Sequence, residues 1–295
     1  MTGILFMALL SLGGGRQDTS IAVTPGQLLD VRNDHGEIHV STWDRDVVRI
    51  ETGGADDVRF RIDETTRGLR VRPVRVRWPR TEGGRRSRVA RSRGDLDLEL
   101  TITVPRYLHL QLQGIDLDIV VTGTEGEVVA ETVEGDIDLS GGRGDIRLHT
   151  VEGSVRLEGA QGSVEVSAGD GDVTVRDVQG PSVEAESIDG TVLLDGIGTE
   201  RLEAVSVSGD VTVAGAIRPH GRYRLSSQSG DITLLVDHDA GATVAVTSYA
   251  GAFETAFPIV LRDSRRRRFE FVLGSGEARV SLQTFSGDIY LRRRR

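Results

Sequence analysis

The chain has 295 residues, a formal net charge of −9 and 37 glycines, but aromatic residues make up only 4% of it. It contains no cysteine, and all 36 of its basic residues are arginine. Disulfides, thiolate metal sites, cysteine nucleophiles, lysine Schiff bases and phosphate-loop lysines are therefore excluded.

The N-terminus is typical of a secretion signal. An apolar run from Ile4 to Leu12 is followed by Gly13–Gly15 and then by polar sequence. We predict that residues 1–17 are a signal peptide and that the protein is exported to the periplasm or cell surface. The run is too short to span a bilayer, which needs ~20 apolar residues. No basic residue precedes it, so a short buried strand that begins a cytosolic protein is the alternative.

Residues 18–110 are predicted to form an N-terminal β cap that includes an arginine-rich loop. The runs LRVRPVRVRW and LDLELTITVP have the alternation of strands, and they flank Trp78–Gly94, which is rich in Pro, Gly, Ser and Arg. Residues 67–93 hold eleven arginines and one acid, and residues 292–295 form a basic tail. We expect these charges to keep a β-rich protein soluble.

Residues 111–291 contain a repeat. Glycine recurs every nine residues from Gly126 to Gly180, and apolar residues follow most of these glycines at the second and fourth positions. Ile137 and Leu139 are one such pair. Short alternating runs bounded by glycine predict strands joined by tight turns.

A longer period shows that two such units make one coil. Thr132-Val133-Glu134-Gly135 returns 18 residues later as Thr150-Val151-Glu152-Gly153, and Ser187 to Ser206 is a step of 19. The sequence therefore predicts an all-β protein, a single-chain β-solenoid with coils of about 18–20 residues and two short strands per coil.

Aromatic residues are absent from Leu108 to Arg222, which indicates a narrow aliphatic interior. They gather before and after the regular coils, where the open strand edges of terminal coils need covering. We expect residues 240–272 to be an irregular segment or cap that precedes a last coil at 276–291.

The Gly-Asp pairs raise the question of calcium. A calcium-binding nonapeptide has a ligand Asp two places after its last glycine, and here Ile146 occupies that place in GGRGDIRLH. A structural role is favoured, in which Gly forms the turn and the adjacent Asp, Ser or Thr accepts a backbone hydrogen bond. Stacked coils would then place residues 136, 154, 172, 191 and 210 in one column, where charged and neutral residues alternate. Arg143-Gly144-Asp145 belongs to the same repeat, so we do not assign it a receptor-binding role.

No catalytic, cofactor-binding or metal-ligating residue is assigned, and no cofactor is expected. Asp170 and Asp172 are the best acid–base candidates if the solenoid cleaves a polysaccharide. His35 and His39 are four residues apart on an expected strand, which is not a metal-ligand pattern. Arg85–Arg93 lacks interleaved aromatic residues, so specific nucleic-acid binding is not expected.

The sequence resembles the family of bacterial "putative adhesin" domains of unknown function, which carry repeated sGDI.l units. The resemblance rests on LDVRNDHGEIHVSTWDRDVVRIE, on LDLELTITVPRYLHLQLQG and on LQTFSGDIYL, and it covers residues 28–291. It implies an envelope-associated β-solenoid without established catalysis. The arginine-rich loop departs from the family pattern.

These observations predict a non-enzymatic envelope protein that serves as an adhesin or as a structural or interaction module. The expected partners are a protein or glycan surface, or another copy bound through strand edges. No membrane span is expected once the signal is removed. The alternatives are a carbohydrate-active β-helix enzyme and a cytosolic scaffold or regulatory module.

Overall fold

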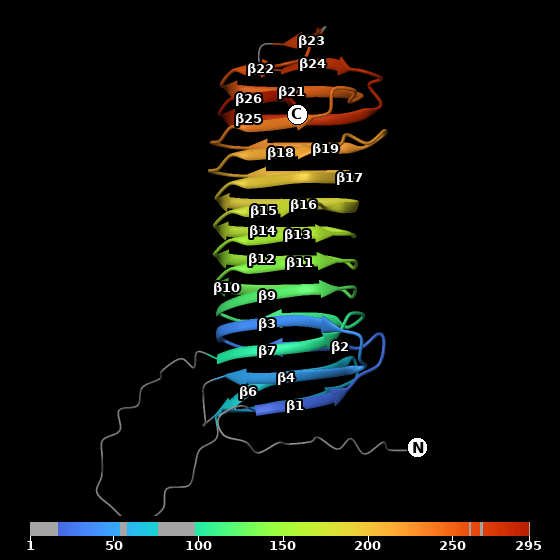
Figure 1. Ribbon diagram of the computed structural model, residues 1–295. Helices are drawn as coiled ribbons and strands as arrows, with labels where there is room; N and C mark the ends of the chain where they lie inside the picture. Colours follow the sequence, from blue (N-terminus) through green and yellow to red (C-terminus); the bar gives the residue numbers. More distant parts are fainter. Residues whose placement is uncertain (1–16, 54–57, 76–97, 260, 266–267, 295) are drawn as a thin grey trace, which may run out of the picture.

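The computed structural model describes residues 17–53, 58–75, 98–259, 261–265 and 268–294. Within them the chain is all-β, and successive coils stack into a tall column (Figure 1). The predicted β-solenoid is confirmed. Strand pairing divides the column into two stacks of strands that face each other across the interior, and almost every coil gives one strand to each stack.

The first stack begins at the N-terminal end of the column. Its two lowest strands are antiparallel, and the central strands are parallel. In spatial order it contains β5 (Val58–Thr65), β6 (Gly68–Arg75), β2 (Leu28–Arg32), β8 (His109–Gln113), β10 (Val128–Glu134), β12 (Ile146–Glu152), β14 (Val164–Asp170), β16 (Gln179–Asp189), the second half of β17 (Val192–Ser206), β19 (Arg222–Ser227), β25 (Ala278–Ser286), β21 (Ala242–Ala250), β24 (Arg268–Leu273) and β23 (Leu261–Arg265).

The second stack lies on the other side of the interior. In the same direction it contains β1 (Gln17–Ala22), β4 (Val47–Gly53), β7 (Leu98–Pro105), β3 (His35–Trp43), β9 (Asp116–Thr124), β11 (Ile137–Gly142), β13 (Val155–Ala160), β15 (Val173–Arg176), the first half of β17, β18 (Val211–Gly215), β20 (Ile232–Val236), β26 (Ile289–Arg293) and β22 (Phe253–Thr255).

The register of the parallel strands gives the length of the coil. Val128 pairs with Ile146, and Ile146 pairs with Val164, which are steps of 18 residues. Val164 pairs with Val183, a step of 19, so the coil lengthens slightly towards the C-terminus. Because the register keeps one repeat position above the next, identical or similar side chains form columns along the solenoid.

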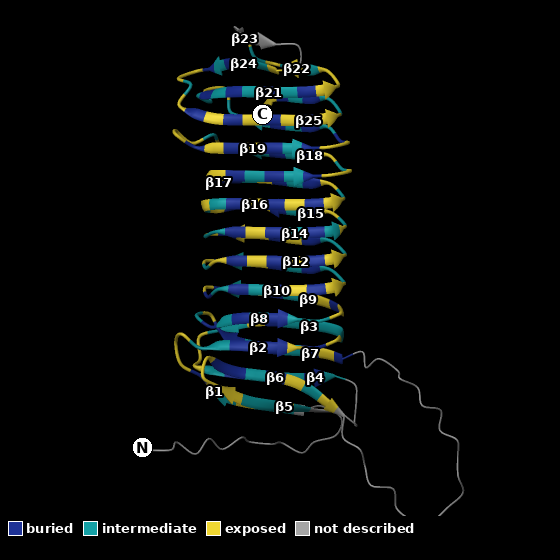
Figure 2. Ribbon diagram, turned by 180° about the vertical axis from the view of Figure 1, so that it is seen from behind, coloured by how far each residue is buried: buried dark blue, intermediate teal, exposed yellow. Residues whose placement is uncertain are grey.

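The interior is made of such columns. Ile119, Ile137, Val155 and Val173 occupy one register position on successive strands of the second stack, and each is at most 1% exposed. Burial alternates along the strands with the period of two that a pleated strand imposes (Figure 2). The repeat therefore specifies the core through its apolar pairs.

At the N-terminal end the chain does not stack in sequence order. β2 lies between β6 and β8, and β3 lies between β7 and β9, so the earliest coil is enclosed by later ones. β4 and β1 then cover the end of the second stack as antiparallel strands. The expected cap at 18–110 thus contains one coil of the solenoid and an antiparallel cover.

At the C-terminal end, too, a coil is inserted out of sequence order. β25 and β26, the last coil in the sequence, lie between β19–β20 and the coil formed by β21 and β22. Segment 240–272, which we expected to be an irregular segment or a cap, lies at this end of the column and is regular β structure in its described part, where it supplies that outer coil and the antiparallel strands β23 and β24. Phe253 contacts Phe269 and Phe271 there, so aromatic side chains close the end of the interior. The basic tail begins within β26, where Arg293 lies over the ring of Phe257.

Candidate interaction surface

The corner where the first stack turns into the second carries the most regular chemistry of the molecule. Most coils contribute to it a residue with a hydroxyl group, an apolar residue, an acidic or small residue, a glycine and an Asp, Ser or Thr. Stacking turns these five positions into five parallel columns. The first column is buried and the second is exposed, although the two are adjacent in sequence.

The buried column consists of Ser and Thr hydroxyls that satisfy the corner backbone. Thr150 Oγ1 donates to the carbonyl of Gly135 at 3.0 Å, and Ser187 Oγ donates to the carbonyl of Gly171 at 2.9 Å. A buried carbonyl without a partner costs free energy, so these hydroxyls hold the corner closed. The same bond to the preceding coil is made by Ser206, Ser227 and Thr284.

The exposed column is apolar, and we call it the corner ridge. Ile188 is 57% exposed and Phe285 is 60% exposed, and the rings of Phe285 and Tyr249 stack with their centroids 5.5 Å apart. Gly169 and Gln228 interrupt the ridge at the corresponding places of two coils. Its members are Ile115, Val133, Val151, Ile188, Val207, Phe285 and Tyr249.

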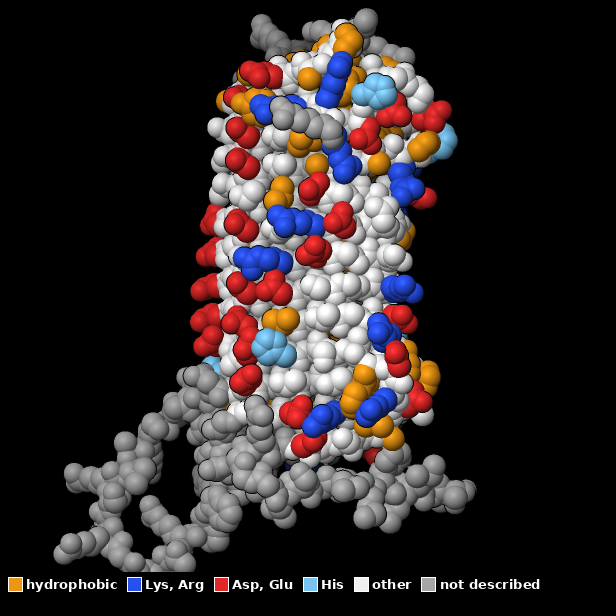
Figure 3. Space-filling view, in the orientation of Figure 1, with side chains coloured by type: hydrophobic (Ala, Val, Ile, Leu, Met, Phe, Trp, Pro, Cys, Tyr) orange, Lys and Arg blue, Asp and Glu red, His pale blue; other side chains and the backbone are white. Residues whose placement is uncertain are grey.

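An acidic column runs beside the lower half of the ridge. Glu134 pairs with Glu152, Glu152 with Asp170, and Asp170 with Asp189, while Asp116 precedes them. Acidic side chains accordingly gather along the edge of the molecule where β10, β12 and β14 end (Figure 3). In the upper coils Ser208, Ser229 and Ser286 replace the acids. The ridge is thus flanked by negative charge over one half and by neutral residues over the other.

The Asp column after the glycines links one coil to the next. Asp136 Oδ1 accepts a hydrogen bond from the backbone N–H of Ser154 at 2.7 Å, and Asp172 Oδ1 accepts one from Thr191 at 2.8 Å. The same contact is made by Asp118, Asp210, Asp231 and Asp288. The expected column 136–154–172–191–210 is present and alternates between charged and neutral residues as predicted, and the structure extends it to Asp118 at one end and to Asp231 and Asp288 at the other. In these two extensions Asp follows Asp, and each of these carboxylates accepts a backbone N–H.

The glycines are required by the approach of one coil to the next. A Cβ atom on Gly153, whose φ is +140°, would overlap the carbonyl oxygen of Gly135. A Cβ on Gly190 would overlap the carbonyl of Gly171, although Gly190 does not have a positive φ. Close stacking is therefore the feature that the glycine positions share, and left-handed backbone is found at only some of them.

The acid–base candidates lie in two adjacent columns. Asp170 belongs to the acidic column, and Asp172 belongs to the Asp column, where its carboxylate accepts the Thr191 N–H. In the described part of the chain, no group of three or more His, Asp or Glu side chains is placed to hold a metal ion. His39 Nε2 lies 2.7 Å from Glu37 Oε1, and His35 Nδ1 lies 3.8 Å from Asp116 Oδ2, so the two histidines face different carboxylates.

The Arg-Gly-Asp triplet is part of an ordinary coil. Arg143 lies 3.7 Å from Glu125 in an exposed ion pair, and the Asp145 carbonyl accepts the N–H of Val128. The predicted signal peptide, residues 1–17, lies outside the described residues except for Gln17, and the arginine stretch at 85–93 lies outside them entirely. Within the described part there is no helix with the length and hydrophobicity needed to cross a membrane.

Sequence reasoning overlooked the ridge. The tetrad that sets the coil period was recognised, but its first residue was not predicted to be buried or its second to be exposed. The available signal was the side-chain type: small hydroxyl residues recur at the first place, and a mixture of Val, Ile, Phe and Tyr recurs at the second. A ring can be accommodated at that second place because it faces solvent.

No curated protein is significantly similar to the chain. One similar solved structure is that of a "putative cell adhesion protein" from Clostridium sporogenes, which is 9% identical, with coverage of 95% of this chain and 100% of that chain and a TM-score of 0.28. The model of the Toastrack DUF4097 family matches residues 29–292. The chain therefore belongs to the Toastrack DUF4097 family, an uncharacterised domain family.

Proposed function

We propose that this protein is a non-enzymatic module of the cell envelope, which uses the corner ridge to bind the surface of another protein. The ridge carries the proposal because it is an apolar column that remains exposed over successive coils. Large exposed apolar patches on soluble proteins mark interaction sites. Rigid stacking fixes the spacing of the column, so little conformational freedom is lost when a partner binds.

The charge beside the ridge specifies the chemistry of the partner. Asp116, Glu134, Glu152, Asp170 and Asp189 flank its lower half. A complementary partner surface would place apolar side chains on the ridge and basic side chains on the acidic column. A second copy docked on the lower half would bring two acidic columns together, so a different protein is favoured over self-association there.

Two further supports concern location and activity. The apolar run before Gly13 favours export, and export would place the ridge among envelope components. Asp172, one member of the acid–base pair considered for polysaccharide cleavage, accepts a backbone N–H that joins two coils. This structural role favours an interaction module over the carbohydrate-active enzyme.

Binding should be tested with the full chain and a matched pair of variants. Val151 on the ridge and Val74 on β6 are each 44% exposed, so Val151→Glu and Val74→Glu add the same charge at equal exposure. We expect Val151→Glu to reduce retention on immobilised envelope proteins of the source bacterium at least fivefold. Val74→Glu should change it less than twofold.

The location is tested separately. A tagged full-length chain expressed in the source bacterium should be recovered from the envelope or extracellular fraction, with a known cytosolic protein as the control. Recovery with the cytosolic control would contradict export and favour the scaffold alternative. Equal retention of the two Val→Glu variants would contradict the ridge as the contact surface, wherever the protein is located.

A further inference from the structure

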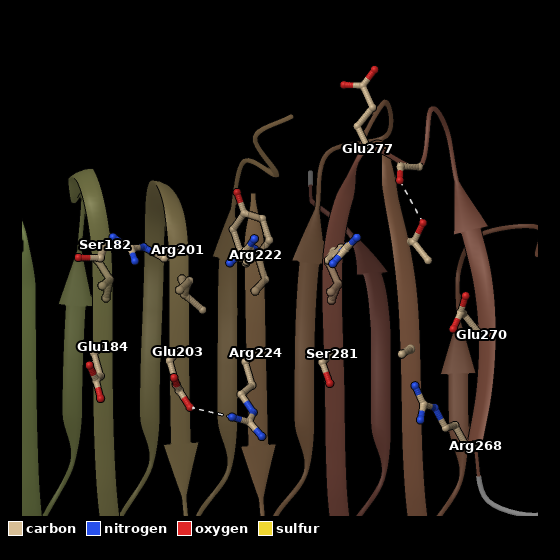
Figure 4. A pocket seen from close by; sticks show the side chains of 18 residues that line it. Ser182, Glu184, Arg201, Glu203, Arg222, Arg224, Arg268, Glu270, Glu277 and Ser281 are labelled. Carbon is tan, nitrogen blue, oxygen red and sulfur yellow. Dashed lines mark hydrogen bonds and ion pairs between the residues drawn. The ribbon is translucent and has the colours of Figure 1, made fainter. Parts of the chain in front are cut away.

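A groove on the outer face of the first stack lies away from the corner ridge. It extends over β16, β17, β19 and β25 and reaches β21 and β24, and its volume is about 1370 Å³. Figure 4 shows arginine and glutamate side chains that project from neighbouring strands along this groove. The ridge and the groove share no residue, so the groove is a second surface with its own chemistry.

A column of arginines lines one side of the groove. Arg201 pairs with Arg222, and Arg222 pairs with Arg279, so the three occupy one register position on β17, β19 and β25. Neighbouring strands are ~4.8 Å apart, which places three guanidinium groups along ~10 Å. All three are exposed, and within the described part of the chain none of their side chains has a hydrogen bond or an ion pair. Stacked like charges repel one another, so this column is set up for an anionic ligand.

Two residues further along the strands, the same register position holds carboxylates on the strands below the arginines, and only β17, with Arg201 and Glu203, carries both charges. Glu165 pairs with Glu184, and Glu184 pairs with Glu203. Partial burial, together with Glu186, Glu165 and Glu203, raises the pKa of Glu184 above its ordinary value. Arg224 continues this column above Glu203 and lies 3.5 Å from it. The groove therefore holds the three arginines between glutamate acceptors, with Glu184 and Glu203 at its lower end and Glu270 and Glu277 at its upper end.

We propose that this groove binds an acidic polysaccharide. The carboxylates of the sugar chain would lie along Arg201, Arg222 and Arg279, and its hydroxyls would donate to the glutamates. A guanidinium matches a carboxylate in a two-point hydrogen bond. Polyphosphate and the phosphodiester backbone of DNA have no hydroxyl donors for the adjacent glutamates, so a glycan with both carboxylates and hydroxyls is favoured over them. This proposal does not depend on the function of the ridge.

The test is binding of the full chain to polygalacturonate at low salt, measured by calorimetry beside dextran, polyphosphate and single-stranded DNA. Polygalacturonate should bind, dextran should not, and both phosphate polymers should bind at least tenfold more weakly. Arg222→Gln should weaken polygalacturonate binding at least tenfold and reduce its dependence on salt. If Arg222→Gln does not fold, Arg201→Gln on β17 replaces it, and it should weaken polygalacturonate binding by the same factor.

The matched control is Arg156→Gln, which removes the same charge from an exposed arginine on β13 in the other stack. It should change affinity less than twofold. No binding of polygalacturonate, or equal effects of Arg222→Gln and Arg156→Gln, would overturn the assignment of the groove. Phosphate polymers that bind as tightly as polygalacturonate would overturn the glycan as its ligand.

Discussion

The Oδ1 atom of Asp136 accepts a hydrogen bond of 2.7 Å from the backbone N–H of Ser154, which lies on the next coil. This contact assigns the Gly-Asp units a role between coils, because the carboxylate satisfies a donor that belongs to the coil above. The repeat therefore encodes the stacking of coils as well as the turn within each coil.

The two kinds of Asp in the repeat should differ in their contribution to stability. Asp136→Ala removes the acceptor for Ser154 and should lower the free energy of unfolding by about 1–2 kcal/mol. Asp145→Ala is the matched control, since its side chain makes no hydrogen bond in the described part of the chain, and it should cost about 0.5 kcal/mol or less. Urea unfolding followed by circular dichroism measures both; equal losses would contradict an inter-coil role.

Ile137→Asp should prevent proper folding. Ile137 is fully buried between the two stacks, and an ionised carboxylate there has no partner. We expect a loss of more than about 4 kcal/mol, seen as insoluble or unfolded protein. Asp138→Asn, at the neighbouring residue whose side chain is 43% exposed, should fold normally. A soluble Ile137→Asp protein with an unchanged melting temperature would refute the aliphatic interior.

The buried hydroxyl column can be tested with a change that keeps the shape of the side chain. Thr150 is fully buried, and Thr150→Val leaves the Gly135 carbonyl without its 3.0 Å hydroxyl partner, so it should cost about 1–3 kcal/mol. Thr174→Val is the control, because Thr174 lies on the outer face of β15. In thermal unfolding, Thr150→Val should have a clearly lower melting temperature than Thr174→Val. Equal melting temperatures would argue against the role of the hydroxyl.

The column of Glu165, Glu184 and Glu203 predicts that removing the charge of Glu184 stabilises the protein at neutral pH but not at acidic pH. Partial burial and the neighbouring glutamates raise the pKa of Glu184, so the folded state favours its protonated form. Stability from this group is present below the ordinary glutamate pKa of about 4.3 and is lost as the pH rises through the raised value. Glu184→Gln should therefore raise the melting temperature at about pH 7 and leave it unchanged at about pH 3.

The control for that prediction lies on the opposite stack. Glu158 pairs in register with Ser140 and Arg176, so no carboxylate is its neighbour in the column. Glu158→Gln should not stabilise the protein at either pH. If Glu184→Gln and Glu158→Gln raised the melting temperature equally at neutral pH, the cause would be the change in net charge and not the carboxylate column.

Calcium should not stabilise the solenoid. Asp210, Asp231 and Asp288 stack on successive coils, and the carboxylate of each accepts a backbone N–H. We expect melting temperatures within about 2 °C in calcium and in chelator, which for a chain of this size is a change of less than about 1 kcal/mol. A large calcium-dependent rise would show that the Asp column is a cation site.

The sequence predicted the coil and its interior well, because both arise from local rules. Alternating apolar residues such as Ile137 and Leu139 specify strands with one buried face, and the step from Thr132 to Thr150 specifies the length of the coil. The column of Asp136 and its equivalents also followed from the period. Its hydrogen bonds did not, since they join residues on different coils.

The candidate surfaces were less accessible from the sequence. Val151 and Thr150 are neighbours in the repeat, yet one is 44% exposed and the other is fully buried. Alternation does not show which way a corner turns, so it could not identify the corner ridge. The arginine groove was hidden for a different reason, because Arg222 and Arg279 are far apart in sequence and adjacent in space.

By itself the sequence determined a β-solenoid of aliphatic coils closed by aromatic ends, because periodic burial and tight turns are local and repeat along the chain. Only the tertiary structure decided the order of coils at the two ends. There, β2 and β3 lie between strands that come later in the sequence, and β25 and β26 lie between strands that come earlier. A strand edge accepts any strand of suitable register, so pairing at the ends depends on which edges are left open once the chain is assembled.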